Sequence, residues 1–295
     1  MKRKYLYLAS LGVAFLLLPV VTYCQIPLAS TPTRKKSYVS VQTPQVSKMS
    51  TDAQLSEGTV QQVQEQVTYV DGLGRPIQLI HTKGSRSYAD VVQPVWYDPY
   101  GKESKKYLSY SAADQPAAYK TKAIKSSTGT YVGSDQFQFY QHGGDVATDL
   151  APFSQTVMEA SPLDRAAKQG AVGNAWQPDQ YADDHTIRYN YTSNNADEVF
   201  LWILVGDQFQ LGEKQFYDPN ELFLTETKDE NWRSTDGNSG TVKEYKDKQG
   251  RVVLRRIYTN NQMHDTYYVY DDSGNLRYVL PPEASERLRA LFMIR

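Results

Sequence analysis

The feature that most constrains this chain is a short turn motif that occurs four times along it. In each copy a tyrosine stands just ahead of Asp-x-x-Gly. A long or basic residue follows the glycine, and then strand-like sequence begins. The four copies span Tyr69–Arg75, Tyr97–Lys102, Tyr245–Arg251 and Tyr270–Asn275. Such a unit builds a β-hairpin, and repeated hairpins build a surface, while nothing in the unit performs chemistry.

The aspartate and the glycine of each copy have different roles in a type I turn. Aspartate favours the first position, where its carboxylate accepts hydrogen bonds from backbone N–H groups. Glycine three residues later takes the positive φ that lets the chain re-enter a strand, so a Gly→Val change there should destabilise the fold. The predicted turn residues are Asp71, Gly74, Asp98, Gly101, Asp247, Gly250, Asp271 and Gly274.

The segments between these turns predict strands. Val67–Val70 and Arg251–Tyr258 are rich in the β-branched and aromatic residues that strands prefer. The fold class is therefore mainly β, with antiparallel sheets of hairpins and few short helices. The expected helices lie near 112–123, from Ser161 to Gly170, and from Pro281 to Phe292, and further strands are expected at 131–140 and 199–205.

These units resemble the tyrosine–aspartate repeats of the RHS proteins, a family of large bacterial secreted and surface proteins. Glu244–Arg256 and Tyr267–Pro282 carry the clearest likeness. Val70–Gln78 and Pro152–Arg165 are similar to an uncharacterised domain that precedes the repeats in many family members. The resemblance covers roughly residues 63–282.

The resemblance implies the start of an RHS-like β shell. In that family the repeats form a hollow shell around a C-terminal effector, which is often a toxin. This chain stops at Arg295, so we expect a truncated, split or partial product. Its partners would then be the downstream repeats or the C-terminal effector of a longer product.

The first residues are typical of a secretory signal peptide, predicted to span 1–24. Lys2, Arg3 and Lys4 precede an apolar run from Leu8 to Val21, and cleavage is expected between Cys24 and Gln25. An uncleaved N-terminal anchor and lipidation of Cys24 remain alternatives. We expect an exported protein of the periplasm, cell surface or extracellular space, with no stable membrane span after cleavage.

Three further segments follow in the predicted organisation. Residues 25–62 are dominated by Ser, Thr, Gln, Pro and Lys, which favours a disordered linker. An N-terminal β domain is expected over 63–240, and repeat hairpins with a terminal helix over 241–295.

Charge and cysteine content exclude some classes of partner. Without residues 1–24 the chain has 29 basic and 33 acidic residues, a net charge of −4, which argues against nucleic-acid binding through a basic surface. Cys24 is the only cysteine, so cleavage would leave neither a disulfide nor a thiolate metal site.

Few residues are candidates for chemistry. Asp183, Asp184 and His185 form the one acidic–histidine cluster, which we interpret as a solvated turn. His142 precedes two glycines in an apparent loop. Asp265, Asp271 and Asp272 have oxygen ligands suited to Ca²⁺, although turn capping is the preferred interpretation of this region. We predict no catalytic residue, no cofactor and no metal.

The sequence therefore favours a non-catalytic structural module. A carbohydrate- or protein-binding β module and a secreted hydrolase are the two alternatives. Exposure of Trp96, Trp176, Trp202 and Trp232 on one face would favour glycan binding. We also expect an open sheet edge at Tyr267–Tyr270 or Tyr278–Leu280, and self-association through it without a defined symmetric oligomer.

Overall fold

The computed structural model describes residues 25–49, 51–143, 146–179 and 183–293. The predicted signal peptide and Cys24 lie outside these residues. Within them the protein is mainly β, as predicted, and its strands pair antiparallel in three sheets of five, nine and two strands. No helix in the described ranges is long and apolar enough to cross a membrane.

The five-stranded sheet forms the N-terminal part of the molecule. Strand β2 shows how this sheet forms its core. Its side chains alternate between a buried face and a more exposed face, and Val67 and Tyr69 pack in the core with Ile80. The strand order is β1-β2-β3-β4-β6. Its strands are β1 (Tyr38–Pro44), β2 (Val63–Val70), β3 (Pro76–His81), β4 (Asp90–Pro94) and β6 (Tyr110–Ala112).

The nine-stranded sheet follows, in the order β16-β15-β14-β13-β12-β9-β8-β7-β5. Most neighbours in this order are also neighbours in the sequence, as expected of consecutive hairpins. The strands are β5 (Lys105–Tyr107), β7 (Phe153–Met158), β8 (Ala166–Gly170), β9 (Thr186–Ser193), β12 (Phe223–Lys228), β13 (Thr241–Lys246), β14 (Val252–Thr259), β15 (Gln262–Tyr270) and β16 (Leu276–Leu280).

A separate hairpin covers the C-terminal end of this large sheet. Within the described part of the chain, strands β10 (Phe200–Val205) and β11 (Gln208–Phe216) pair only with each other. Phe200 and Trp202 of β10 pack with Tyr245, Leu254 and other buried residues of the sheet, which makes this the largest core of the molecule. Helix α3 (Pro282–Met293) follows β16, contacts β15 and ends the described chain.

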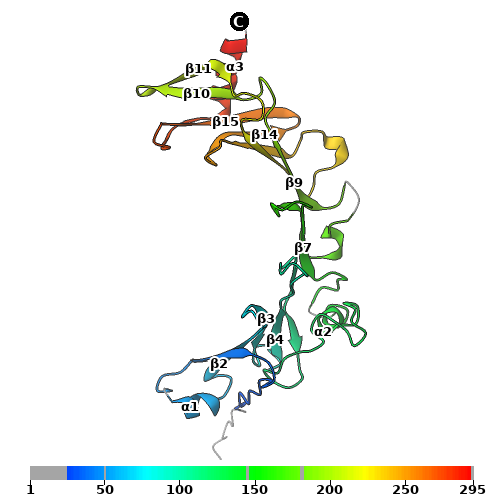
Figure 1. The fold of residues 1–295 in the computed structure, drawn as a ribbon. Coiled ribbons are helices and arrows are strands. Elements are labelled where there is room, and N and C mark those ends of the chain that lie inside the picture. The colour runs from blue at the N-terminus through cyan, green and yellow to red at the C-terminus, as the bar shows by residue number, and fades with distance from the viewer. Residues whose placement is uncertain (1–24, 50, 144–145, 180–182, 294–295) are drawn as a thin grey trace, which may run out of the picture.

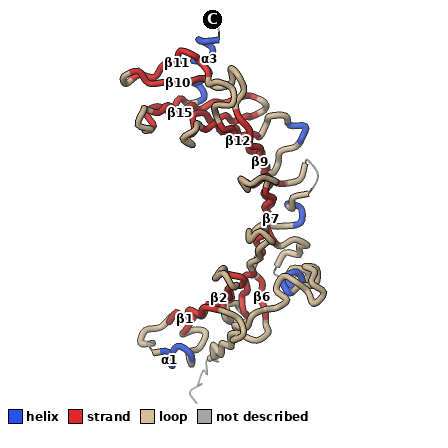
Figure 2. Tube along the Cα trace, in the orientation of Figure 1, coloured by secondary structure: helices blue, strands red, loops and turns tan. Residues whose placement is uncertain are grey.

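The two large sheets are almost continuous. An isolated bridge joins Val95, just after β4, to Lys106 in β5. Figure 1 shows the result, an open arc that begins at the five-stranded sheet, passes β7 and β9, and ends at β10, β11 and α3. The secondary-structure colouring in Figure 2 shows strands along the whole arc and helices only as short pieces beside it.

The prediction of a disordered linker over 25–62 is wrong. Strand β1 lies inside that range and pairs with β2 along its whole length, from Tyr38↔Tyr69 to Pro44↔Val63. The short helix α1 (Asp52–Ser56) also lies there, capped by Thr51. A polar strand can be ordered without its own core because β2 supplies its backbone hydrogen bonds.

The predicted domain boundary at residue 240 does not correspond to a break in the structure. Strand β12 precedes this position and β13 follows it, yet they pair over six residues, from Phe223↔Lys246 to Lys228↔Thr241. The repeat hairpins therefore continue the same sheet that begins at β5.

Three local predictions are also wrong. Residues 112–123 contain no helix, because backbone groups of Ala117 and Lys120 bond instead to side chains of β4 and β3. The strand expected at 131–140 is the short helix α2 (Asp135–Phe139), for which Ser134 is the N-cap. The helix expected from Ser161 is the turn of the β7–β8 hairpin. The predicted C-terminal helix is confirmed as α3.

Candidate functional site

The four repeated turns have the geometry that their sequence predicts. Gly74, Gly101, Gly250 and Gly274 have φ angles between 79° and 82°, in the left-handed region that favours glycine. Each glycine N–H donates to the carbonyl of its turn aspartate. The Oδ1 atoms of Asp71, Asp98, Asp247 and Asp271 accept the backbone N–H of the residue after the glycine at 2.8–3.0 Å.

The first turn offers a matched test of this backbone requirement. Gly72 and Gly74 both have open space where a Cβ would lie, but only Gly74 has a positive φ. Gly74→Ala should therefore lower the free energy of unfolding by about 1–2 kcal/mol, whereas Gly72→Ala should change it by less than about 0.5 kcal/mol. Urea unfolding of both variants measures the difference. Equal effects would contradict the turn geometry.

The basic residue after the turn glycine reaches the next hairpin. The Arg75 guanidinium lies 4.3 Å from the ring centroid of Tyr97, the tyrosine of the second motif, and its Nη1 donates to the carbonyl of Gly101 at 3.2 Å. Arg251 repeats this arrangement, with its guanidinium 5.0 Å from the Tyr270 ring centroid. Both arginines also pair with the aspartate of their own turn.

The β7–β8 hairpin contains a fifth turn of this kind, which the sequence analysis missed. Ser161 replaces the aspartate and accepts the N–H of Leu163. Asp164 replaces the glycine, with φ of 57°. Arg165 follows it and stacks 4.0 Å from the ring centroid of Tyr191 in β9. The sequence signal for this turn was Leu163-Asp164-Arg165 after Ser161. Aspartate tolerates positive φ, so it can take the place of the turn glycine ahead of a basic residue.

Lys102, the basic residue of the second turn, contacts this fifth turn through an ion pair with Asp164. The first turn thus contacts the second, the second contacts the fifth, and the fifth contacts β9. Arg251 joins the third turn to the fourth in the same way. We call these five turns and their basic residues the turn row. It links successive hairpins through side chains, in addition to the backbone pairing of the strands.

The repeated tyrosines fall into two classes that the sequence analysis treated as one. Tyr69 and Tyr245 stand two residues before their aspartates and are fully buried in the sheet cores. Tyr97 and Tyr270 stand directly before theirs and are half-buried beneath the preceding arginine. Because successive side chains of a strand alternate between its faces, this one-residue difference decides whether the ring fills the core or contacts the turn row.

Only Asp184 of the Asp183–His185 cluster is buried, whereas Asp183 and His185 are exposed, so the interpretation as a solvated turn is wrong for Asp184 alone. Asp184 is 7% exposed and accepts hydrogen bonds from Lys168, Thr186 and Arg188. Burial raises the pKa of its carboxyl, but these hydrogen bonds, together with one from the backbone N–H of Asp179, outweigh that effect and lower the pKa to about 2. Asp184 thus joins β8 to β9 and is fully engaged in that role.

Acid should weaken the fold through Asp184. Its folded pKa of about 2 lies below the ordinary 3.8, so its stabilisation is complete above about pH 4 and is lost as the pH falls toward 2. The loss should be about 2 kcal/mol. Glu159, whose pKa is also lowered to about 2 by Arg165, titrates in the same window. Urea unfolding of wild type and Asp184→Asn between pH 2 and 5 isolates Asp184, and identical pH slopes would contradict this expectation.

The two histidines considered as candidates for chemistry, His185 and His142, both contact protein atoms. His185 lies 3.2 Å through Nδ1 from the carbonyl oxygen of Glu230, and its ring packs against Trp176. His142 contacts the carbonyl of Gln138 at the end of α2. No group of three or more metal-ligating side chains occurs within the described ranges.

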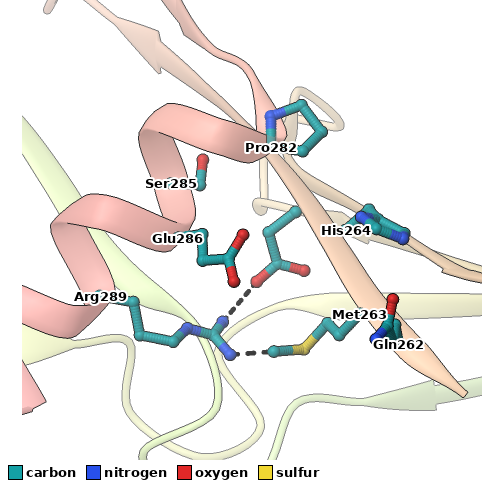
Figure 3. A pocket seen from close by; sticks show the side chains of 8 residues that line it. Gln262, Met263, His264, Pro282, Ser285, Glu286 and Arg289 are labelled. Carbon is teal, nitrogen blue, oxygen red and sulfur yellow. Dashed lines mark hydrogen bonds and ion pairs between the residues drawn. The ribbon is translucent and has the colours of Figure 1, made fainter.

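A polar pocket of about 330 Å³ lies beneath α3 (Figure 3). Figure 3 shows the Arg289 side chain reaching from the helix across this pocket, and its partners are Asp265 and Met263. Asp265 also accepts two hydrogen bonds from Arg256, at 2.7 and 3.0 Å. Burial alone would lower the pKa of Arg256, but Asp265 raises it above its ordinary value. The pocket carboxylate is therefore neutralised by two guanidinium groups.

The aspartates weighed as Ca²⁺ ligands do not come together. Asp265 lies within β15 and pairs with Arg256, whereas Asp271 caps the turn after the same strand. Six residues of extended strand separate them by about 20 Å. Asp271 thus has the turn-capping role that the sequence analysis preferred.

The four tryptophans do not form an exposed face. Trp202 is buried in the C-terminal core, and Trp96 and Trp232 are half-buried. Trp176 is 37% exposed and lines a cavity of about 370 Å³ with Gln169, His185 and other residues.

Comparison with known proteins supports one assignment. No curated protein matches the chain. A family model described as DUF6443, a domain of unknown function, matches residues 42–192, about half of the chain. The match begins within β1 and ends in β9, so it includes the first two repeated turns and the fifth turn. The chain therefore belongs to the DUF6443 family.

Proposed function

We propose that this chain is a non-catalytic structural module of an exported RHS-type protein, placed before and at the start of its repeats. The turn row carries the proposal. The arginines that follow two of the repeated turns contact the tyrosine of the next motif, as in Arg75 over Tyr97 and Arg251 over Tyr270. A module whose repeated side chains contact the neighbouring hairpin is suited to building a wall of hairpins.

The shape of the molecule agrees with this role. The strands form a nearly continuous antiparallel strip that bends into an open arc. Further hairpins added beside β16 would extend the strip in the same direction, because β16 is the last strand of the nine-stranded sheet. The downstream repeats of a longer product are thus the partner that fits this end, and an effector would lie inside the extended shell.

The ionisable groups considered for chemistry also support a structural role. Asp184 is held by Lys168 and Arg188, and Asp265 by Arg256 and Arg289. A general acid or base needs a carboxyl that can exchange a proton with a substrate. Carboxylates paired with two cations are poorly suited to that task, so we propose that the module has no enzymatic activity.

Two measurements on the source organism test the proposal. Sequencing of the locus beyond the codon for Arg295 should reveal further tyrosine–aspartate repeats in some frame. Mass spectrometry of the product from envelope and medium fractions should give an N-terminus at Gln25. An unrelated downstream sequence, together with an intact Met1 in the cytoplasm, would contradict the assignment.

Carbohydrate binding is a second candidate, and the cavity beside Trp176 is the observation that favours it. The partly exposed indole of Trp176 lines this cavity with Gln169, Ser154 and Glu230, which supply polar groups beside an aromatic ring. Titration with oligosaccharides, followed by Trp fluorescence, tests it. Saturable binding that Trp176→Ala removes and Trp232→Phe retains would support this candidate, and a flat titration would exclude it for the sugars used.

A further inference from the structure

Strand β1 forms an unusually open edge of the five-stranded sheet. Among the described residues it pairs with β2 alone, and it lies at the end of the strand order. Six of its seven residues are exposed, including Val39 at 58% and Val41 at 55%. Its sequence, Tyr-Val-Ser-Val-Gln-Thr-Pro, has no charged side chain. Long uncharged edges with β-branched residues readily accept another strand.

The direction of the free backbone groups follows from the pairing with β2. The carbonyl of Ser37 accepts from Val70, and the N–H of Gln45 donates to Gln62, so these odd-numbered positions point toward β2. Antiparallel pairs alternate along a strand. The N–H and C=O groups of Tyr38, Ser40 and Gln42 therefore point outward, away from the sheet.

The opposite end of the molecule has a better protected edge. Strand β16 is five residues long, carries Arg277 and is followed by Pro281 and Pro282. Short length, charge and proline are the features by which natural proteins discourage edge pairing between separate molecules, whereas a downstream hairpin would pair within the same chain. Self-association is therefore expected at β1 rather than at the C-terminal hairpins.

We propose that β1 is a dimerisation edge that pairs antiparallel with β1 of a second copy, joining two five-stranded sheets across a two-fold axis. A second copy is the favoured occupant because this edge is self-complementary. With Ser40 opposite Ser40 of the partner subunit, Tyr38 lies opposite the partner's Gln42, so every outward-pointing group of these residues gains a partner. This inference does not depend on the proposed function.

The same register brings the exposed valines together. Val39 then lies opposite the partner's Val41, in the non-hydrogen-bonded positions where side chains of antiparallel strands are closest. The basic residues at 34–36 precede β1. In this register Lys36 lies opposite the uncharged Pro44 of the partner subunit, so no like charges face each other. Shifting the register by two residues loses bonds at one end or places Pro44, which has no N–H, opposite Tyr38.

A pairing of one short strand with another buries little surface, so the dimer should be weak. We expect a dissociation constant on the order of 10–100 µM. Sedimentation velocity of the protein, expressed from Met1 and purified as the cell leaves it, should show a monomer–dimer equilibrium between about 1 and 300 µM. A monomer throughout this range, or growth beyond a dimer, would overturn the proposal.

Lysine substitutions at the two sheet edges test which edge strand forms the dimer contact. Val39→Lys should weaken dimerisation by at least about tenfold, and Val41→Lys should do the same. Val279→Lys is the matched control, because Val279 is an edge valine of β16 with 49% exposure. It should leave the dimer intact. Disruption by Val279→Lys alone would place the contact at β16 and contradict the proposal. Far-UV circular dichroism confirms that each variant is folded.

Disulfide trapping tests the register. In a Cys24→Ser background, which has no other cysteine, Val39→Cys and Val41→Cys proteins are prepared separately. On mild oxidation the mixture should form a heterodisulfide, because these positions face each other, and each protein alone should form much less. Preferential homodisulfides, or capture of neither species at concentrations where dimers form, would show that the strands do not pair in this way.

Discussion

Asp265→Ala is expected to lower the free energy of unfolding by about 3–5 kcal/mol. The carboxylate is 5% exposed and neutralises Arg256, which is 4% exposed. It also holds Arg289 of α3. Removing it takes away both short hydrogen bonds of the buried Arg256 guanidinium to a carboxylate and leaves Glu198, at 3.7 Å, as its remaining acidic partner. Urea unfolding followed by circular dichroism measures the loss.

A double variant distinguishes the unpaired charge from lost packing. Arg256→Met/Asp265→Leu removes both members of the cross-strand pair and fills the space with apolar atoms, so it should be substantially more stable than Asp265→Ala. Arg289 is exposed enough to reach water in both variants. If the double variant is as unstable as Asp265→Ala, the ion pair is not the source of the effect.

Tyr245→Ala is expected to cost about 3–5 kcal/mol, whereas Tyr270→Ala should cost only about 1 kcal/mol. Both are tyrosines of the repeated motif. Tyr245 is fully buried beside Leu254, and its hydroxyl donates to Glu198. Tyr270 lies on the other face, covered by Arg251, and donates to the carbonyl of Val252 at 3.0 Å.

The comparison tests the division of the tyrosines into two classes. Both variants remove the same side chain from neighbouring repeats, so the difference between their unfolding free energies reports position alone. A smaller loss for Tyr245→Ala than for Tyr270→Ala would contradict the observed assignment of faces.

The turns were predictable because they are local. The aspartate and glycine of each motif fix the backbone through contacts within five residues, so the sequence contains everything needed to place Asp71 and Gly74. The fifth turn was not predicted because Ser161 and Asp164 take the places of the aspartate and the glycine with different side chains. Pro162 at the next position also favoured a helix start, which the pairing of β7 with β8 overrides.

Features that depend on distant segments were not predictable in this way. The polar strand β1 is ordered because β2 lies beside it, and no property of Tyr38–Pro44 alone reveals that neighbour. Asp184 is buried because Lys168 on β8 reaches it from sixteen residues away. The stacking of Arg251 on Tyr270 likewise requires the β14–β15 hairpin to be folded first.

The central claim is that the basic residue that follows a turn stabilises the next hairpin, and a double-mutant cycle between Arg251 and Tyr270 tests it most directly. Urea unfolding is measured for Arg251→Met, Tyr270→Leu and the double variant. A second cycle pairs Arg251→Met with Tyr258→Leu. Tyr258 is a half-buried tyrosine at the far end of β14, seven strand residues and therefore about 23 Å away.

The account predicts a coupling free energy of about 0.5–1.5 kcal/mol between Arg251 and Tyr270. It predicts a coupling free energy below about 0.3 kcal/mol between Arg251 and Tyr258. A coupling between Arg251 and Tyr270 no larger than that of the control pair would contradict the claim that the turn row joins successive hairpins.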